Sequence, residues 1–304
     1  MGKITDYRGF VAAAFTPFYP DGMLHLAQVG KIVEHLIADG VQGLYVCGST
    51  GEGPSLTVDE RQATAEAYIK AAAGRIPVIV HVGHDSLQEA RGLAAHAVQI
   101  GADAVAAMPP AYFKCRTLEA LIASLHEIAS AAEGVPFYYY HIPALSGLNF
   151  SMTSFLEQAA QCIPNLAGIK FSDANLHELQ GCVDLQDGRF NVLFGVDEMV
   201  LGAWAMGATG AVGSTYNFAA PLYRKAVGAL EAGDLDEARL YQGLAGEAVR
   251  VLQGYRGLPG IKAMMSLIGL DCGPCRLPHV ALSVAELQQL RSDMRTIGFF
   301  DWGR

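Results

Sequence analysis

The sequence predicts a (β/α)8 barrel that is followed by a C-terminal helical extension. Three observations carry this prediction: eight short apolar runs alternate with helical patterns, the runs are nearly continuously apolar, and no break in composition separates them. Parallel strands that are covered on both faces have this character. A doubly wound parallel sheet is the alternative. However, the glycine-dense stretch GSTGEG (48–53) that follows a strand fits neither the dinucleotide fingerprint nor the P-loop.

The expected strands follow one another at regular intervals. In order, they cover residues 9–17, 42–49, 77–83, 102–109, 136–143, 166–173, 191–198 and 209–217. Capping boxes, or their asparagine variant, open several of the helices. The pairs are Thr57 with Glu60, Ser86 with Glu89, Asn175 with Glu178 and Ser283 with Glu286. We expect one structural domain, with the barrel strands and intervening helices in 1–218 and the last barrel helix and the extension in 219–304.

Composition narrows the class of partner. The chain has 304 residues, 51% hydrophobic and 17% charged, with a formal net charge of −9. An acidic protein is a poor fit to nucleic acid or to an anionic membrane surface. The N-terminus lacks the apolar region of a signal peptide, and no apolar run approaches the roughly 18 residues that span a bilayer. We therefore expect a cytoplasmic protein with six reduced, mostly structural cysteines.

Lys170 lies inside the apolar run LAGIKFSD (166–173). Lysine is almost never fully buried unless something compensates. Either the strand is an edge and the ammonium reaches water, or a carboxylate such as Asp173 pairs with it, or its burial serves chemistry. A desolvated amine attacks carbonyl groups, and the resulting iminium weakens a neighbouring carbon–carbon bond. This is the chemistry of class I aldolases, which needs no metal. The expected cofactor is therefore none.

Polar residues stand at the ends of six of the expected strands, where barrels carry their active sites. They are Ser49, Thr50, His81, Tyr140, His141, Lys170, Ser172, Asp197, Glu198, Ser214 and Thr215. The phenol of Tyr140 is a candidate proton shuttle, although at most one tyrosine of the YYY run (138–140) is expected to be catalytic. The GSTGEG turn offers hydroxyl groups and backbone N–H groups to a carboxylate.

Five motifs in unbroken order resemble a known family. GSTGEG, YYYHIPALSG, GIKFSD, FGVDE and GAVGSTYN lie within residues 8–280. Together they resemble the N-acetylneuraminate lyases, within the dihydrodipicolinate synthase-like superfamily of pyruvate-dependent aldolases, and they are more similar to the animal-type lyases. The resemblance implies reversible cleavage of N-acetylneuraminate to N-acetylmannosamine and pyruvate.

The resemblance also implies roles for individual residues. Lys170 takes the Schiff-base role, Tyr140 is the catalytic tyrosine, and Ser49 with Thr50 binds the substrate carboxylate. The implied ligands of the sugar tail and of the reacting carbons are Gly195, Asp197, Glu198, Ser214 and Ser172. Tyr112 resembles a tyrosine that supports the catalytic tyrosine of a neighbouring subunit, which implies a homotetramer.

One absence favours the lyase over the synthase. The synthase branch carries an arginine that grips a second substrate carboxylate, whereas this chain has Ala144 and Leu145 at that point. Asp197 and Glu198 suit sugar hydroxyl groups, because carboxylates accept hydrogen bonds from them. Another pyruvate-dependent aldolase, such as a 2-keto-3-deoxy sugar acid aldolase, and a non-catalytic sialic-acid-binding barrel stay open as alternatives.

Two further motifs are interpreted as incidental. CGPC (272–275) follows a helical segment rather than opening a helix, so we expect a loop without a redox role. HVGHD (81–85) could suggest a metal-dependent aldolase. His81 and His84 are three residues apart, however, and would point to opposite faces of a strand.

Overall fold

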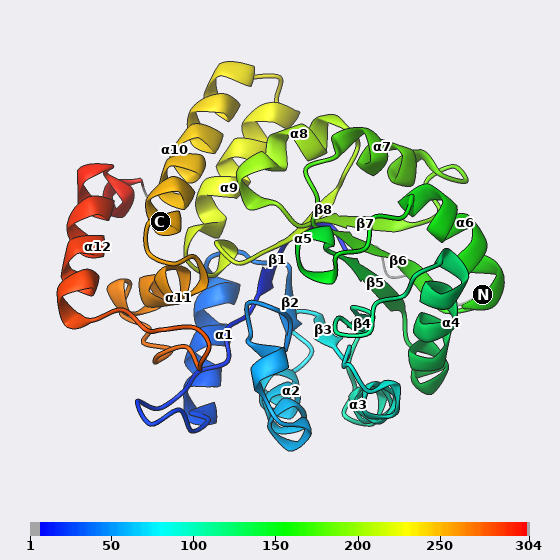
Figure 1. The fold of residues 1–304 in the computed structure, drawn as a ribbon. Coiled ribbons are helices and arrows are strands. Elements are labelled where there is room, and N and C mark those ends of the chain that lie inside the picture. Colours follow the sequence, from blue (N-terminus) through cyan, green and yellow to red (C-terminus); the bar gives the residue numbers. More distant parts are fainter. Residues whose placement is uncertain (1–6, 303–304) are drawn as a thin grey trace.

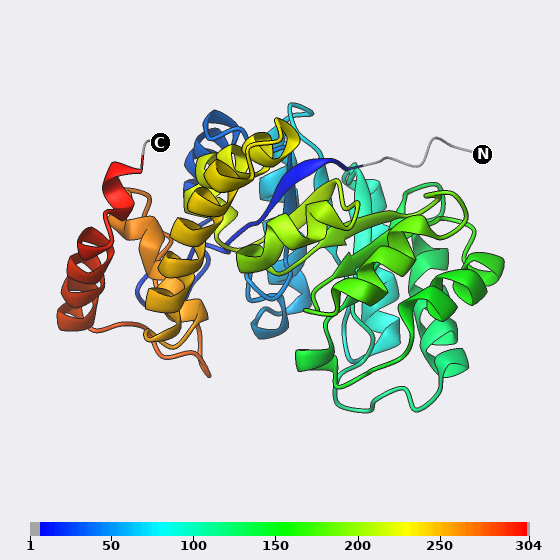
Figure 2. The ribbon, with the colours of Figure 1, turned by 90° about the horizontal axis from the view of Figure 1, so that it is seen from above.

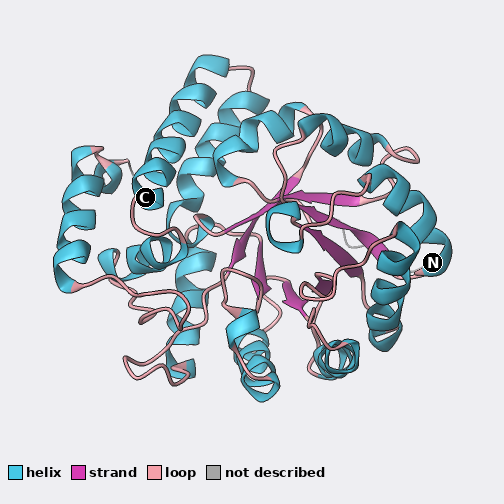
Figure 3. Cartoon of the chain, in the orientation of Figure 1, coloured by secondary structure: helices cyan, strands magenta, loops and turns pink. Residues whose placement is uncertain are grey.

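Eight parallel strands close into a barrel in chain order (Figures 1 and 3). The fold was obtained as a computed structural model, and it describes residues 7–302. The strands are β1 Gly9–Ala13, β2 Gly43–Val46, β3 Val78–His81, β4 Ala104–Ala107, β5 Phe137–His141, β6 Leu166–Phe171, β7 Asn191–Phe194 and β8 Gly210–Gly213. The pairing of Gly9 with Gly210 closes the ring. The predicted barrel is confirmed, but each strand ends a few residues before the end of its predicted run, so that Ser49, Ser172, Asp197 and Ser214 lie in the loops that follow.

Most of the helices surround the barrel on its outer side, whereas the short α5 (Pro143–Ser146) lies in front of the barrel opening (Figures 1 and 3). Those up to β8 are α1 Val29–Ala38, α2 Val58–Ala72, α3 Leu87–Gln99, α4 Leu118–Ala129, α5 Pro143–Ser146, α6 Met152–Cys162, α7 Leu176–Asp184 and α8 Val200–Ala205. The later ones are α9 Tyr216–Glu231, α10 Leu235–Gln253, α11 Leu258–Leu267 and α12 Val284–Thr296. Short 3-10 helices cover 26–28, 53–55, 130–132, 197–199 and 299–301. Within residues 7–302, no helix combines the length and apolar character needed to cross a membrane.

The predicted helix starts are present, but in two of the four pairs, Ser86 with Glu89 and Asn175 with Glu178, only the cap hydrogen bond from the glutamate backbone N–H forms. Thr57 and Ser283 each form a complete capping box with the glutamate three residues later. Asn175 accepts a hydrogen bond from the backbone N–H of Glu178, but the Glu178 carboxylate accepts from the backbone N–H of Met152 at 2.5 Å. Glu178 therefore links the start of α7 to the start of α6 instead of completing a box.

The C-terminal helices pack beside the barrel rather than around it (Figure 2). Helix α10 lies along α9, and α11 and α12 follow on the same side. Leu290 and Met294 of α12 belong to the same buried cluster as Phe10 of β1. Burial of apolar surface thus joins the extension to the barrel.

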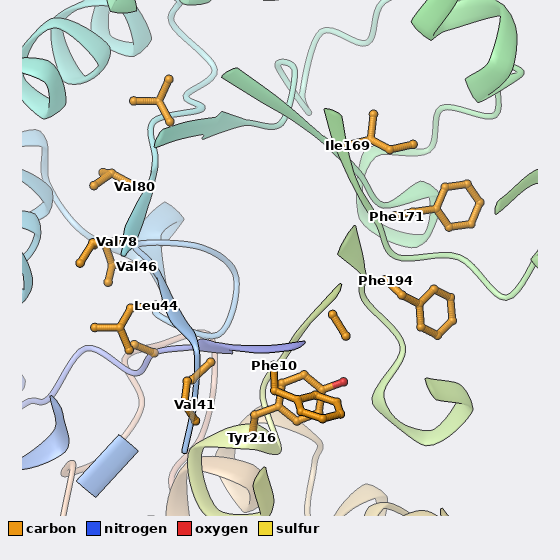
Figure 4. Close-up of a cluster of buried hydrophobic side chains, with 14 of the residues drawn as sticks. Phe10, Val41, Leu44, Val46, Val78, Val80, Ile169, Phe171, Phe194 and Tyr216 are labelled. Carbon is orange, nitrogen blue, oxygen red and sulfur yellow. The ribbon is translucent and has the colours of Figure 1, made fainter. Parts of the chain in front are cut away.

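Alternation along the strands separates two layers of side chains. Figure 4 shows Val78 and Val80 of β3, and Ile169 and Phe171 of β6, pointing away from the barrel interior toward the helices. Successive strand residues point to opposite faces. Lys170, between Ile169 and Phe171, therefore points into the barrel.

Candidate active site

Lys170 is buried between two aromatic rings at the C-terminal end of β6. Lys170 is only 5% exposed. The Nζ atom lies 4.1 Å from the ring centroid of Tyr140 and 4.4 Å from that of Tyr45. Among residues 7–302, no carboxylate lies within ion-pair distance of it. Asp173, the sequence-based candidate, lies instead 3.9 Å from His141 Nε2, because it is on the outward-facing side of the strand end.

The strand register selects one tyrosine of the YYY run. Tyr140 is the direct partner of Lys170 across β5 and β6. Tyr139 points outward, where its ring packs 4.7 Å from that of Phe155 on α6. Tyr138 points inward but lower in the barrel, and its hydroxyl donates to Asn191 Oδ1 at 3.0 Å. Only Tyr140 of the three has its ring against the lysine.

Tyr45 is a site residue that sequence reasoning missed. Its ring meets that of Tyr140 edge-on at 5.9 Å, and its hydroxyl is buried without a hydrogen-bond partner in the described structure. Burial raises the pKa of Tyr45 well above its usual value. The signal in the sequence was an aromatic residue at an inward position of an otherwise aliphatic strand.

The ring of His81 packs against that of Tyr140. The two rings lie edge-on at 5.8 Å, and His81 Nε2 accepts from the backbone N–H of Met108 at 3.1 Å. Burial, then the nearby charges of Arg61 and Lys170, lower the pKa of His81 well below its usual value. The ring is therefore neutral, and His81 serves as packing rather than as a source of charge.

The two histidines of HVGHD have separate partners. His84 Nδ1 accepts from the backbone N–H of Ser86 at 2.9 Å, at the start of α3. His81 is bound to Met108 as described. In the part of the chain that the structure describes, no three His, Cys, Asp or Glu side chains gather as metal ligands would.

The GSTGEG turn follows β2 and holds Ser49 and Thr50 half-buried. The turn folds back on itself, since the backbone N–H of Gly53 donates to the carbonyl of Gly48 at 3.0 Å. A Cβ atom at position 53 would lie 2.0 Å from the Cys47 carbonyl oxygen, so only glycine fits there. The turn is thus compact and tightly closed.

Asp197 lies in the loop after β7 and is bound to Thr215, in the loop after β8. Its Oδ2 accepts from the backbone N–H of Thr215 at 2.9 Å and from the Thr215 hydroxyl at 2.6 Å. Burial raises the pKa of Asp197, although the Thr215 hydrogen bonds oppose this. A Cβ on Gly213 would lie 2.0 Å from Oδ1, so this glycine makes room for the carboxylate. Glu198, in contrast, is exposed.

Ser172, Gly195 and Ser214 occupy the neighbouring strand ends. The Ser172 hydroxyl is buried without a hydrogen-bond partner among the described residues. A Cβ on Gly195 would lie 1.9 Å from that hydroxyl oxygen, so Gly195 gives Ser172 its space. Ser214 is half-buried, and its carbonyl accepts from Asn217 Nδ2 at 2.8 Å.

Tyr112 lies apart from these residues. It is 80% exposed on the loop between β4 and α4, and its ring packs edge-on against Phe113 at 5.0 Å. Its backbone N–H donates to Asp85. Within one chain, the structure does not bring Tyr112 into contact with Lys170 or Tyr140.

Two features together define the class of this protein. They are the (β/α)8 barrel and a lysine that is buried at the C-terminal ends of the strands with no carboxylate partner among residues 7–302. The model of the dihydrodipicolinate synthetase family matches residues 6–297, and the chain belongs to this family. It is 42% identical to N-acetylneuraminate lyase A of Xenopus laevis over 89% of this chain and 90% of that protein. The resemblance to N-acetylneuraminate lyases that the motifs indicated is confirmed.

Two solved structures show the same likeness in three dimensions. The N-acetylneuraminate lyase of Proteus mirabilis is 36% identical, with a TM-score of 0.95, over 97% of this chain and all of that chain. The N-acetylneuraminate lyase of Aliivibrio salmonicida is 40% identical, with a TM-score of 0.94, over 97% of this chain and 98% of that chain.

Proposed function

We propose that this protein is a class I aldolase that reversibly cleaves N-acetylneuraminate to N-acetylmannosamine and pyruvate. The observation that carries the proposal is Lys170, buried against Tyr140 and Tyr45 with no carboxylate partner among residues 7–302. A lysine that no carboxylate binds, and that two rings hold in place, can offer its side-chain nitrogen to a carbonyl carbon. The likeness to lyases along nearly the whole chain supports the same substrate.

The reaction begins at the keto carbon of the open-chain sugar acid. The Lys170 amine adds to the C2 carbonyl, and loss of water gives an iminium. The C4 hydroxyl then loses its proton as the C3–C4 bond breaks, and the electron pair moves into the iminium to form an enamine. Protonation of the enamine and addition of water release pyruvate and the free amine.

Tyr140 is the proposed proton carrier between these steps. It is the nearest phenol on the strand paired with β6, and its ring touches the amine. A positioned acid or base contributes about 10²–10⁴-fold to such steps. Tyr45 and His81 hold the Tyr140 ring from its edges, so the phenol has one orientation.

The substrate is anchored at both ends in this proposal. Ser49 and Thr50 bind the carboxylate beside the keto carbon, and Ser172 contacts the reacting carbons through its free hydroxyl. Asp197 offers Oδ1 to sugar hydroxyl groups, because Oδ2 is bound to Thr215. Gly195, Glu198 and Ser214 complete the region for the polyol tail.

The residues at positions 144, 145 and 197 disfavour a substrate that carries a second carboxylate. Ala144 and Leu145 lie on α5, where the synthase branch has an arginine, so a second carboxylate has no partner there. Leu145 is exposed and apolar. Asp197 would repel a second carboxylate, which supports a neutral sugar as the aldehyde partner.

The remaining features of the proposal concern cofactors, oligomeric state, domain organisation and location in the cell. The imine chemistry needs no metal and no other cofactor. Tyr112 serves a neighbouring subunit's Tyr140 in a homotetramer, which its exposure supports. The barrel and the C-terminal helices form one domain, supported by their shared buried cluster. We assign the protein to the cytoplasm, which its six unpaired cysteines support.

Pyruvate release tests the function. The protein is incubated with N-acetylneuraminate, and pyruvate is followed by its coupled reduction to lactate. In parallel, it is offered pyruvate with aspartate semialdehyde. We expect cleavage of the sugar and negligible condensation. Faster condensation than cleavage would identify a synthase, and no turnover with either would favour a binding protein.

A further inference from the structure

We propose that the buried Glu52–Lys262 pair positions the turn that binds the substrate carboxylate, so that the C-terminal extension sets the affinity for pyruvate. This inference rests on the proposed function, because it takes Ser49 and Thr50 to be the carboxylate ligands. Glu52 and Lys262 are positioning residues, since neither reaches the reacting atoms. The pair is called the clasp below.

The clasp joins two distant parts of the chain inside the protein. Lys262 Nζ, on α11, donates to Glu52 Oε1, in the GSTGEG turn, at 2.7 Å. Both side chains are 1% exposed. The ammonium also lies 4.2 Å from the ring centroid of Phe18, which shields it from water.

The second carboxylate oxygen binds the loop that follows α11. Glu52 Oε2 accepts from the backbone N–H of Arg276 at 2.7 Å. Lys262 Nζ donates in turn to the carbonyl of Pro274 at 3.0 Å. Burial, and then Glu52 through its charge and a hydrogen bond, raise the pKa of the Cys275 thiol to about 12. Glu52 is therefore held by α11 and by the CGPC loop together.

The turn needs this support because its backbone is strained. Glu52 has φ +54° and ψ +29°, in the left-handed region that non-glycine residues rarely adopt. Its backbone N–H donates to the carbonyl of Ser49 at 3.1 Å. A fixed Glu52 therefore fixes the peptide units of Ser49 and Thr50. Strained residues that surrounding contacts hold in place are frequent at binding sites.

Stability alone does not explain a charged pair at this place. Removing two charges from water is costly, and apolar residues of similar volume often stabilise a fold as well as a buried ion pair. An ion pair, unlike apolar packing, fixes direction through its hydrogen bonds. The clasp connects to one turn, and that turn carries the proposed carboxylate ligands.

The test uses the full chain in three forms. Glu52→Gln/Lys262→Met removes both charges and leaves neither one buried alone. Glu60→Gln is the control, because Glu60 binds the Arg276 side chain at 2.6 and 2.7 Å and links the same extension to α2 without touching the clasp. The wild type is the reference, and folding of each form is checked by circular dichroism and melting temperature.

Three kinds of measurement are made on each form. They are the pyruvate concentration that half-saturates borohydride trapping, the KM and kcat for N-acetylneuraminate, and hydrogen exchange of the amides in 48–53. We expect the double variant to raise half-saturation and KM at least tenfold with kcat within about threefold. Its turn amides should exchange at least tenfold faster. Glu60→Gln should keep all three within twofold, even if its melting temperature falls.

A folded double variant with wild-type half-saturation and wild-type turn exchange would overturn the proposal. Equal losses in Glu60→Gln would also overturn it, because the cause would then be a loosened extension. If the wild type traps no pyruvate, the proposed function fails. In that case, hydrogen exchange alone decides whether the clasp orders the turn.

Discussion

Lys170 and Tyr140 are direct partners across β5 and β6, and the lysine Nζ lies 4.1 Å from the tyrosine ring centroid. The contact follows from the parallel register, which places both side chains on the inner face at the same height. Their outward-facing neighbours, Ile169, Phe171 and Tyr139, pack against the helices instead. The same register that builds the core therefore builds the proposed catalytic pair.

Replacing Tyr140 tests the proton-transfer role. Tyr140→Phe removes only the hydroxyl, so we expect kcat to fall by about 10²–10⁴ while pyruvate still forms an imine at Lys170. Tyr139→Phe is the matched control, because Tyr139 faces Phe155 and has no contact with the lysine. Steady-state kinetics check the prediction. A near-normal kcat for Tyr140→Phe would assign proton transfer to another group, with Tyr45 the first candidate.

Replacing Asp197 tests recognition of the sugar. Asp197→Ala removes a carboxylate whose Oδ1 is proposed to bind hydroxyl groups, and such a loss costs about 1–3 kcal/mol or more. We expect kcat/KM for N-acetylneuraminate to fall at least tenfold while half-saturation by pyruvate stays near normal. Asp173→Asn, which changes another strand-end carboxylate, should alter neither value by more than twofold. Equal weakening of pyruvate trapping by Asp197→Ala would place Asp197 at the imine instead.

Acid should destabilise the fold through His141. Burial lowers the pKa of His141 to about 4, below its usual value of about 6.5, although Asp173 and Glu178 oppose the shift. The unfolded chain therefore binds a proton that the folded chain does not. The associated stability is complete above about pH 6.5 and is lost as the pH falls toward 4. The total is about 3 kcal/mol, at about 1.4 kcal/mol per pH unit.

Urea unfolding at several pH values between 4.5 and 7 measures this loss. His141→Phe keeps an aromatic ring against Phe171, and His141 Nδ1 has no hydrogen-bond partner to lose in the described structure. We expect the variant to lose less stability with acid than the wild type. His126→Asn, at an exposed position, should follow the wild-type slope. An unchanged slope in His141→Phe would contradict the assignment.

The CGPC loop should have no redox function. Burial raises the pKa of both Cys272 and Cys275 to about 12, so neither thiol is ionised to a reactive thiolate near neutral pH. Cys272→Ser/Cys275→Ser should keep lyase activity within about threefold, because a serine hydroxyl can replace the Cys275 donor to Glu52. Activity is assayed with and without mild reductant. Redox-dependent activity in the wild type that the double variant loses would contradict this prediction.

The barrel and part of its site could be predicted because both follow from local patterns. Buried parallel strands are continuously apolar, so a lysine inside LAGIKFSD is conspicuous, and capping pairs mark helix starts. The choice of Tyr140 within YYY rests on the family resemblance, because alternation alone leaves both Tyr138 and Tyr140 on the inner face.

Other features depend on contacts that no local pattern encodes. Tyr45 and His81 come from β2 and β3, and only barrel closure brings them to Tyr140. Glu52 and Lys262 are 210 positions apart, and no sequence pattern around either residue indicates the other. Glu178 could be read as completing a cap, but its carboxylate binds the start of α6 instead.

The most direct test of the account is to identify the residue that becomes covalently attached to the substrate. The protein is treated with N-acetylneuraminate and borohydride, in the presence and absence of EDTA, and its peptides are analysed by mass spectrometry. We expect a stable three-carbon adduct on Lys170 under both conditions, with Lys262, which is also buried, unmodified. An adduct on a different residue, or no adduct despite turnover, would contradict it.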